Sequence, residues 1–120
     1  MKKYIKYAPI AALAALASCA SSTDSDVITM LVGTYTYDTS HGIYSFAFNQ
    51  QNGSFQALDS AEIANPSYLC ISPDAQHVYS ITESGENSSV SAFYFDAATG
   101  SLSLLNTVPA DADPCHIALI

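Results

Sequence analysis

The chain contains three histidines, and one of them, His116, occupies a position where acid–base chemistry is possible. It follows a proline and a cysteine at the start of an apolar segment that ends at Ile120. An imidazole exchanges protons near neutral pH, so such a residue can serve as a general base. Glu83, which directly follows the predicted strand His77–Thr82, is the second residue of interest. Each also has a structural interpretation: His116 as a strand histidine bonded to a carbonyl, and Glu83 as a solvated loop carboxylate.

Other reactive patterns are missing from the sequence. There is no Gly-x-Ser-x-Gly elbow for a serine nucleophile, no Cys-x-x-Cys pair and no His-Glu-x-x-His motif. Asp111 and Asp113 are too few and too closely spaced to hold a metal ion. His41 and His77 are interpreted as surface or structural residues. The sequence therefore predicts neither a metal site nor a cofactor.

One segment of the chain occurs twice. GIYSFAFNQQNGSFQAL, from Gly42 to Leu58, aligns with SVSAFYFDAATGSLSLL, from Ser89 to Leu105, at an offset of 47 residues. A second pair follows at an offset of 48 residues: NPSYLCI from Asn65 and DPCHIAL from Asp113. Repetition at this period indicates a repeat architecture, because one unit cannot bury its own apolar faces and needs neighbours.

The pattern between turn signals is that of β-strands, and no helical period occurs after the N-terminal segment. Gly53 marks a turn that needs a positive φ, and the stretch from Pro73 to Gln76 has the composition of a type I turn. The predicted strands are Ile28–Thr36, Ile43–Asn49, Phe55–Ile63, Ser67–Ser72, His77–Thr82, Val90–Asp96, Leu102–Val108 and Cys115–Ile120.

A repeat of about 47 residues with four strands has the size of a propeller blade. With the strands of a blade labelled A to D from the innermost, the chain begins at a B strand, completes one further blade and ends in an A strand. A ring that begins this way takes its missing A strand from the other terminus. The sequence therefore predicts an all-β fold over residues 27–120, an incomplete β-propeller of about two four-stranded blades from a longer chain. The alternative is a small β-sandwich complete in itself.

The first 18 residues have the pattern of an export signal, with three lysines among the first six residues and then the apolar run Tyr7–Ser18. This run is short for a membrane span. Leu16–Cys19 resembles a bacterial lipobox, which implies a diacylated Cys19 and a protein that is exported and anchored to a bacterial membrane. The alternative is an ordinary signal peptide with a chance cysteine. Residues 19–26 are then a polar, flexible tether.

All three lysines belong to this signal, so the chain from Cys19 onward has eleven acidic residues and no Lys or Arg. Its side-chain charge of −11 excludes nucleic acid as a partner, because phosphates require cations, and disfavours polyanionic ligands. Cys70 and Cys115 lie at different offsets from their prolines. This mismatch favours buried free thiols over a disulfide, although an exported protein could pair them.

Several motifs together resemble one known family. VGTYT (32–36), GIYSFAF, NGSF, NPSYLCISPDAQHVYSITE, TGSLSLL and DPCHIAL are similar to the beginning of the seven-bladed lactonase propellers. That family is typified by bacterial 6-phosphogluconolactonase and includes fungal muconate-lactonising enzymes. The resemblance extends from Ile28 to Ile120, about a quarter of a full-length propeller of this kind. It implies hydrolysis of 6-phosphogluconolactone to 6-phosphogluconate.

The resemblance also implies roles for two residues. His116 would line the central channel at the start of an innermost strand and act as general base on the water that attacks the lactone. The same imidazole would then return its proton to the ring-opened alkoxide. Glu83, near the channel mouth, would orient the imidazole or the water. The implied partner is a small lactone.

One departure limits this expectation. A developing oxyanion and a substrate phosphate both require positive charge, which the family supplies as channel arginines and which this segment lacks. We therefore expect these 120 residues to be inactive alone, with the cationic half of the site in the missing blades.

An exported enzyme would also not meet a cytoplasmic substrate. Two other functions stay open: a non-catalytic surface propeller that binds a glycan or a protein, and a lactone-forming cyclase of the muconate type.

Overall fold

The computed structural model describes residues 26–120. The predicted signal peptide at 1–18, its Cys19 and all but the last residue of the tether at 19–26 lie outside the described residues. Within the described range, no helix is both long and apolar enough to cross a membrane. The elements of this range are seven β-strands and one short 3₁₀ helix, η2 (Gly85–Asn87).

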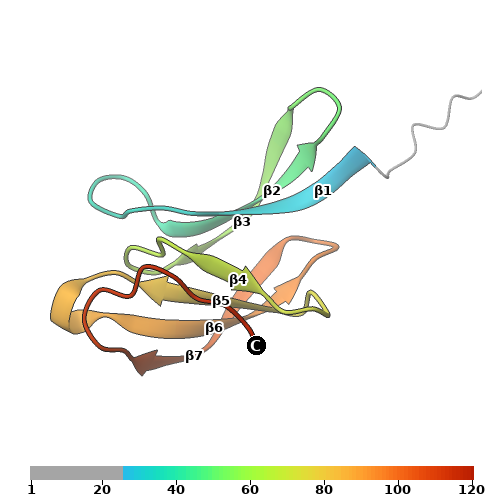
Figure 1. Cartoon of the computed structure of the whole chain (residues 1–120). Helices are drawn as coiled ribbons and strands as arrows, with labels where there is room; N and C mark the ends of the chain where they lie inside the picture. Colours follow the sequence, from blue (N-terminus) through green and yellow to red (C-terminus); the bar gives the residue numbers. More distant parts are fainter. Residues whose placement is uncertain (1–25) are drawn as a thin grey trace, which may run out of the picture.

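The strands form two antiparallel sheets that pack against each other (Figure 1). In both sheets the strands follow one another in chain order, which is the meander of a propeller blade. The first sheet contains β1 (Val27–Gly33), β2 (Gly42–Asn49) and β3 (Phe55–Glu62). The second contains β4 (Leu69–Ile71), β5 (His77–Thr82), β6 (Ser89–Asp96) and β7 (Ser101–Pro109).

The two sheets repeat each other in their irregularities as well as in their strand order. The register of β2 against β3 shifts between Ser45 and Phe46, and that of β6 against β7 shifts between Ala92 and Phe93. These two shifts lie 47 residues apart, the same offset as the sequence repeat. The internal similarity of the sequence is therefore a similarity of backbone geometry.

The turns after β2 and β6 are also equivalent. Asn49 and Asp96 each accept hydrogen bonds at Oδ1 from the backbone N–H groups two and three residues later. Each turn then reaches a glycine with positive φ, 73° at Gly53 and 78° at Gly100. The Thr99 hydroxyl and the backbone N–H groups of this turn hold the pKa of the Asp96 carboxyl below its usual range. The turn that the sequence predicted at Gly53 is thus confirmed.

The hydrophobic core lies between the sheets, because side chains alternate along each strand. In β2, Ile43 and Ser45 are buried against the second sheet, whereas Tyr44 and Phe46 stack on each other on the opposite face, with ring centroids 6.3 Å apart. The buried cluster comprises Ile43, Val78, Phe93, Phe95 and Leu102, and Leu31, Ala61, Ile63 and Leu69 pack against it.

Polar contacts also join the sheets near the β6–β7 turn. Ser45 Oγ donates to the Gly100 carbonyl at 2.6 Å within the buried core. Because both groups are shielded from water, loss of this bond would leave an unpaired acceptor, at a cost of about 1–3 kcal/mol. Two further bonds cross the interface: Leu102 N to Asp59 Oδ2 at 2.9 Å and Thr29 Oγ1 to Ala97 O at 2.7 Å.

The structure confirms the all-β prediction and the strand order, three strands of one blade followed by four of the next. The prediction of a last strand over Cys115–Ile120 is wrong, since these residues have no regular secondary structure. An A strand pairs with the B strand of its own blade, as β4 pairs with β5, and residues 26–120 contain no such partner for this segment. Within residues 26–120, Cys70 and Cys115 are free, as predicted, but Cys115 is exposed rather than buried and Cys70 is half-buried.

Replacing Gly100 with alanine should destabilise the intact protein more than the same change at Gly53. Both positions have positive φ, which costs a residue with a Cβ about 1–2 kcal/mol. At Gly100 the new Cβ would also lie 2.6 Å from Leu58 Cδ1 and 2.9 Å from Ser45 Oγ, whereas at Gly53 nothing lies within 4 Å. Urea unfolding of the two variants should differ by about 1–3 kcal/mol. Equal losses would contradict close packing of this turn on the first sheet.

Candidate functional site

The loops that follow β1 and β5 lie at the same end of the two sheets, at the left in Figure 1. In the ladders, Gly33 pairs with Ile43 and Ile81 pairs with Val90, so these positions are equivalent in the two repeats. Tyr35 and Glu83, two residues further along, are therefore equivalent as well. The structure brings them together, with Tyr35 Oη donating to Glu83 Oε2 at 2.8 Å.

Asn65 joins the same two loops from the segment that leads into β4. Its Oδ1 accepts from the backbone N–H and the hydroxyl of Thr36, at 2.9 and 3.1 Å. Its Nδ2 donates to the Glu83 carbonyl and to Ser84 Oγ, both at 3.1 Å, and its own carbonyl accepts from Glu83 N at 3.2 Å. One buried amide, 8% exposed, thereby fixes the backbone of Glu83 and connects it to the first sheet.

The local sequence explains why asparagine can occupy this place. Asn65 has a φ of 42°, in the left-handed region that asparagine adopts more readily than most residues. Asp113 has a φ of 46° and, like Asn65, precedes a proline. The Asn-Pro and Asp-Pro pairs that the sequence repeats are therefore equivalent bends at the entry to successive innermost segments.

The carboxylate of Glu83 is stabilised in its charged form. The nearby Ser67 hydroxyl and the Tyr35 hydroxyl hold the pKa of the Glu83 carboxyl below its usual range. The same hydrogen bond raises the pKa of the Tyr35 hydroxyl, because only the neutral hydroxyl can donate to the carboxylate and an ionised tyrosine would be repelled by it. Ser67 Oγ is enclosed by protein, yet no hydrogen bond of acceptable geometry joins it to Glu83 or to another group among the described residues.

His116 is exposed and packs against Tyr68, with ring centroids 4.6 Å apart and planes tilted by 56°. The two residues are equivalent in the repeat, each standing two positions after the proline of its innermost segment. Within residues 26–120, no hydrogen bond connects His116 to Glu83. The structure therefore places Glu83 with Tyr35 and Ser67, and His116 with Tyr68.

We refer to these residues together as the loop-end cluster: Tyr35, Asn65, Ser67, Tyr68, Glu83 and His116. It holds an imidazole and a charged carboxylate, which are groups that can bind and activate a water or a hydroxylated ligand. Sequence reasoning named Glu83 and His116 as candidates but did not name Tyr35, Asn65, Ser67 or Tyr68. The available signal was the repeat itself, because an offset of 48 residues pairs Tyr35 with Glu83 and Tyr68 with His116.

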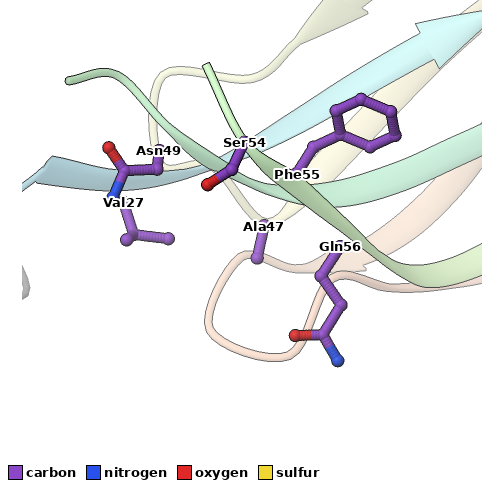
Figure 2. Close-up of a pocket in the computed structure, with 6 residues that line it drawn as sticks. All are labelled: Val27, Ala47, Asn49, Ser54, Phe55 and Gln56. Carbon is purple, nitrogen blue, oxygen red and sulfur yellow. The ribbon is translucent and has the colours of Figure 1, made fainter. Parts of the chain in front are cut away.

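A hollow of about 370 Å³ lies elsewhere, at the far end of β2 (Figure 2). Figure 2 shows that its lining comes from the three strands of the first sheet and the β2–β3 turn, and no lining residue is acidic or basic. Its lining residues are Val27, Ala47, Asn49, Ser54, Phe55 and Gln56. Within residues 26–120, no group of three His, Cys, Asp or Glu side chains is placed to hold a metal ion. The loop-end cluster is therefore the better candidate for chemistry.

The chain begins at the B strand of one blade and continues through a second blade of equivalent geometry. A protein-family match agrees with this architecture. The model of the family described as lactonase, 7-bladed β-propeller, matches residues 29–120. The chain belongs to this family. The lactonase resemblance predicted from the sequence is thus confirmed, and the β-sandwich alternative is wrong.

Known structures and proteins resemble the chain over a limited part of their length. A crystal structure from Bacteroides fragilis, named a candidate 6-phosphogluconolactonase, is 50% identical with a TM-score of 0.78, over 82% of this chain and 28% of that one. The periplasmic gluconolactonase of Pseudomonas aeruginosa is 32% identical with a TM-score of 0.69, over 72% and 26%. The 6-phosphogluconolactonase of Bacillus subtilis is 32% identical over 73% of this chain and 26% of its own length. The chain thus spans roughly a quarter of these lactonases.

Replacing Tyr35 with phenylalanine should raise the pKa of the Glu83 carboxyl, because the variant loses the hydroxyl that bonds to Oε2. The Ser67 hydroxyl remains nearby, so the pKa should stay below that of a free glutamate. Carbon-13 NMR titration of the Glu83 carboxyl measures the change. The matched control is Tyr37→Phe, since Tyr37 stacks on Tyr35 with ring centroids 5.5 Å apart and no bond to Glu83. An unchanged value in Tyr35→Phe, or equal changes in both variants, would contradict this contact.

Proposed function

We propose that the whole protein is a lactonase that hydrolyses a sugar lactone, with 6-phosphogluconolactone as the reference substrate. The observation that carries this proposal is the 50% identity of the chain to the candidate 6-phosphogluconolactonase of B. fragilis, over 82% of the residues. The family match over residues 29–120 and the relatives named as 6-phosphogluconolactonases support it. The chain supplies roughly a quarter of the propeller, so the remaining blades complete the site.

In this proposal His116 is the general base. Its exposed ring, held at one face by Tyr68, takes a proton from a water molecule as that water attacks the lactone carbonyl. The carbon–oxygen bond of the ring then breaks, and the imidazolium returns the proton to the departing alkoxide. No atom is gained by the enzyme, and the products are the open-chain acid and a regenerated imidazole.

Glu83 has the role of orienting the water or a substrate hydroxyl. The sequence left open whether this carboxylate orients the imidazole or the water. Its contacts favour the water, because it bonds to Tyr35 and has no bond to His116 among the described residues. Its lowered pKa keeps it charged, so it accepts hydrogen bonds and does not donate them.

The charge of the segment defines what the other blades must provide. Residues 26–120 contain no lysine or arginine, so this part of the protein cannot neutralise the developing oxyanion or a substrate phosphate. Cationic side chains from the remaining blades complete the site. A substrate without a phosphate needs fewer of them, and a P. aeruginosa relative is named a gluconolactonase.

The location of the protein follows from its N-terminus. We infer an export signal at residues 1–18, a lipid-modified Cys19 and a tether at 19–26 before the propeller that begins at residue 27. The periplasmic location in the name of the P. aeruginosa relative supports export. Mass spectrometry of the mature N-terminal peptide should find Cys19 carrying diacylglycerol. An unmodified peptide that begins at another residue would contradict the lipid anchor.

Replacing His116 with alanine in the whole protein should lower kcat for lactone hydrolysis by about 10²–10⁴-fold, the contribution of a positioned general base. The matched control is His77→Ala, since His77 lies at the end of β5 remote from Glu83 and packs edge-on against Tyr94. Its kcat should stay close to that of the unmodified protein. Circular dichroism of both variants shows whether the fold is retained. A folded His116→Ala variant with an unchanged rate would remove His116 from the mechanism.

A further inference from the structure

The loop after β1 carries two tyrosines that stack on each other at the surface, and we call this pair the tyrosine platform. The rings of Tyr35 and Tyr37 are nearly parallel, with 7° between their planes and 5.5 Å between their centroids. Tyr35 is 49% exposed and Tyr37 is 80% exposed. Since Tyr35 covers one side of the Tyr37 ring, the side that faces away from Tyr35 is the open one. The platform lies at the loop end of the first sheet, at the left in Figure 1.

The tyrosine platform is held in place by residues on either side of β4 and β5. Tyr35 Oη donates to Glu83 Oε2 at 2.8 Å. Thr36, which lies between the two tyrosines, donates through its backbone N–H and its hydroxyl to Asn65 Oδ1, at 2.9 and 3.1 Å. The Tyr35 ring and the backbone of the loop are therefore fixed before a ligand binds. Such preorganisation lowers the entropy that binding must overcome at an exposed site.

A flat aromatic face beside a carboxylate matches the two kinds of surface on a sugar ring. The face of an aromatic ring carries partial negative charge, and it attracts the weakly positive C–H groups on one face of a pyranose ring. The hydroxyl groups around the edge of the sugar need hydrogen-bond acceptors. Glu83 is charged and has about four acceptor positions, more than the single bond from Tyr35 occupies.

The charge and the ring geometry disfavour two other kinds of ligand. Residues 26–120 contain no lysine or arginine, and Asp38 directly follows Tyr37, so an anionic ligand would be repelled. A quaternary ammonium ion is bound by aromatic rings that surround it as a cage, whereas these two rings are parallel and cover each other. A neutral ring with one apolar face therefore fits the tyrosine platform best.

The position of Tyr37 relative to Glu83 sets the size of the ligand. Glu83 bonds to the Tyr35 hydroxyl, and the centroid of the Tyr37 ring lies 5.5 Å beyond that of the Tyr35 ring. The open side of Tyr37 faces away from Tyr35, so a single sugar ring beside Glu83 cannot stack there as well. A ligand that contacts both Glu83 and Tyr37 needs at least two sugar rings.

We infer that the tyrosine platform is a subsite for an uncharged pyranose ring, so that the substrate is a lactone joined to at least one further sugar unit. This inference rests on the proposed function, in which Glu83 orients the water or a hydroxyl of the lactone. The lactone then lies beside Glu83, and the next sugar unit stacks on Tyr37. Because that unit does not react, its stacking lowers KM and leaves kcat unchanged.

The test measures the hydrolysis of three lactones by the whole protein: gluconolactone, which has one ring, and the lactones of cellobionic and maltobionic acid, which carry a second sugar. The unmodified protein should have a lower KM for at least one of the disaccharide lactones. Tyr37→Ala should raise that KM by about 3–10-fold, the contribution of one aromatic stack, at unchanged kcat. The KM for gluconolactone should stay the same in the variant.

Two further variants are matched controls. Tyr37→Phe keeps the aromatic ring and its open side, so it should retain the KM of the unmodified protein for each lactone. Phe55→Ala removes a ring that is 68% exposed at the opposite end of the first sheet, and it should change no KM. Circular dichroism of the variants shows that the fold is retained. A KM for the disaccharide lactones that Tyr37→Ala leaves unchanged would overturn the inference.

A binding measurement separates this inference from the proposed function. In saturation-transfer NMR of the whole protein with methyl cellobioside and methyl maltoside, which contain no lactone, aromatic protons should transfer saturation to sugar C–H protons of at least one glycoside. Tyr37→Ala should lose this transfer and Tyr37→Phe should keep it. Such binding without hydrolysis of any lactone would remove the proposed function and leave the sugar subsite. If no lactone is hydrolysed, transfer that is absent or unaffected by Tyr37→Ala would overturn the subsite too.

Discussion

The side chain of Asn65 is the contact on which the rest of this structure depends. Strands within each sheet are held by their own ladders. The loop ends of the two sheets are joined by the Tyr35–Glu83 bond and by this amide, which bonds to Thr36 on one side and to Glu83 and Ser84 on the other. A buried amide is costly unless its groups are paired, and here both its oxygen and its nitrogen have partners. The relation of one blade to the next is thus set by hydrogen-bond geometry as well as by the apolar core.

This joint also forms the candidate site. Because Asn65 fixes the backbone of Glu83 from both sides, the carboxylate is directed to Tyr35 of the preceding blade. Two contacts of the loop-end cluster join equivalent positions of neighbouring repeats: Tyr35 with Glu83, and Tyr68 with His116. In the proposed function the site lies between blades: this quarter of the ring carries acidic and aromatic groups, and the cationic groups come from other blades.

The sequence was sufficient for the blades and insufficient for the contacts between them. Alternation in GIYSFAF and a repeat of 47 residues predicted β2, β3, β6 and β7 because these strands follow local rules of pattern and turn chemistry. The strand predicted at Cys115–Ile120 failed because its apolar pattern needs a pairing partner that residues 26–120 do not contain. Glu83 and His116 were predicted as site residues from the family resemblance. The contacts of Asn65 could not be predicted, because they join it to groups 29 and 18 residues away and its local sequence indicates only a turn.

Amide hydrogen exchange in the whole protein, with and without the change Asn65→Ala, tests the central role of this side chain most directly. Thr36 N–H and Glu83 N–H belong to different blades. The first bonds to the Asn65 side chain; the second bonds to the Asn65 backbone carbonyl, and the side-chain amide holds this pairing in place through its own bond to the Glu83 carbonyl. The account predicts that both amides exchange faster together in the variant, while amides in the centres of β2 and β6 keep their protection. Unchanged exchange at Thr36 and Glu83, or faster exchange at one of them alone, would contradict it.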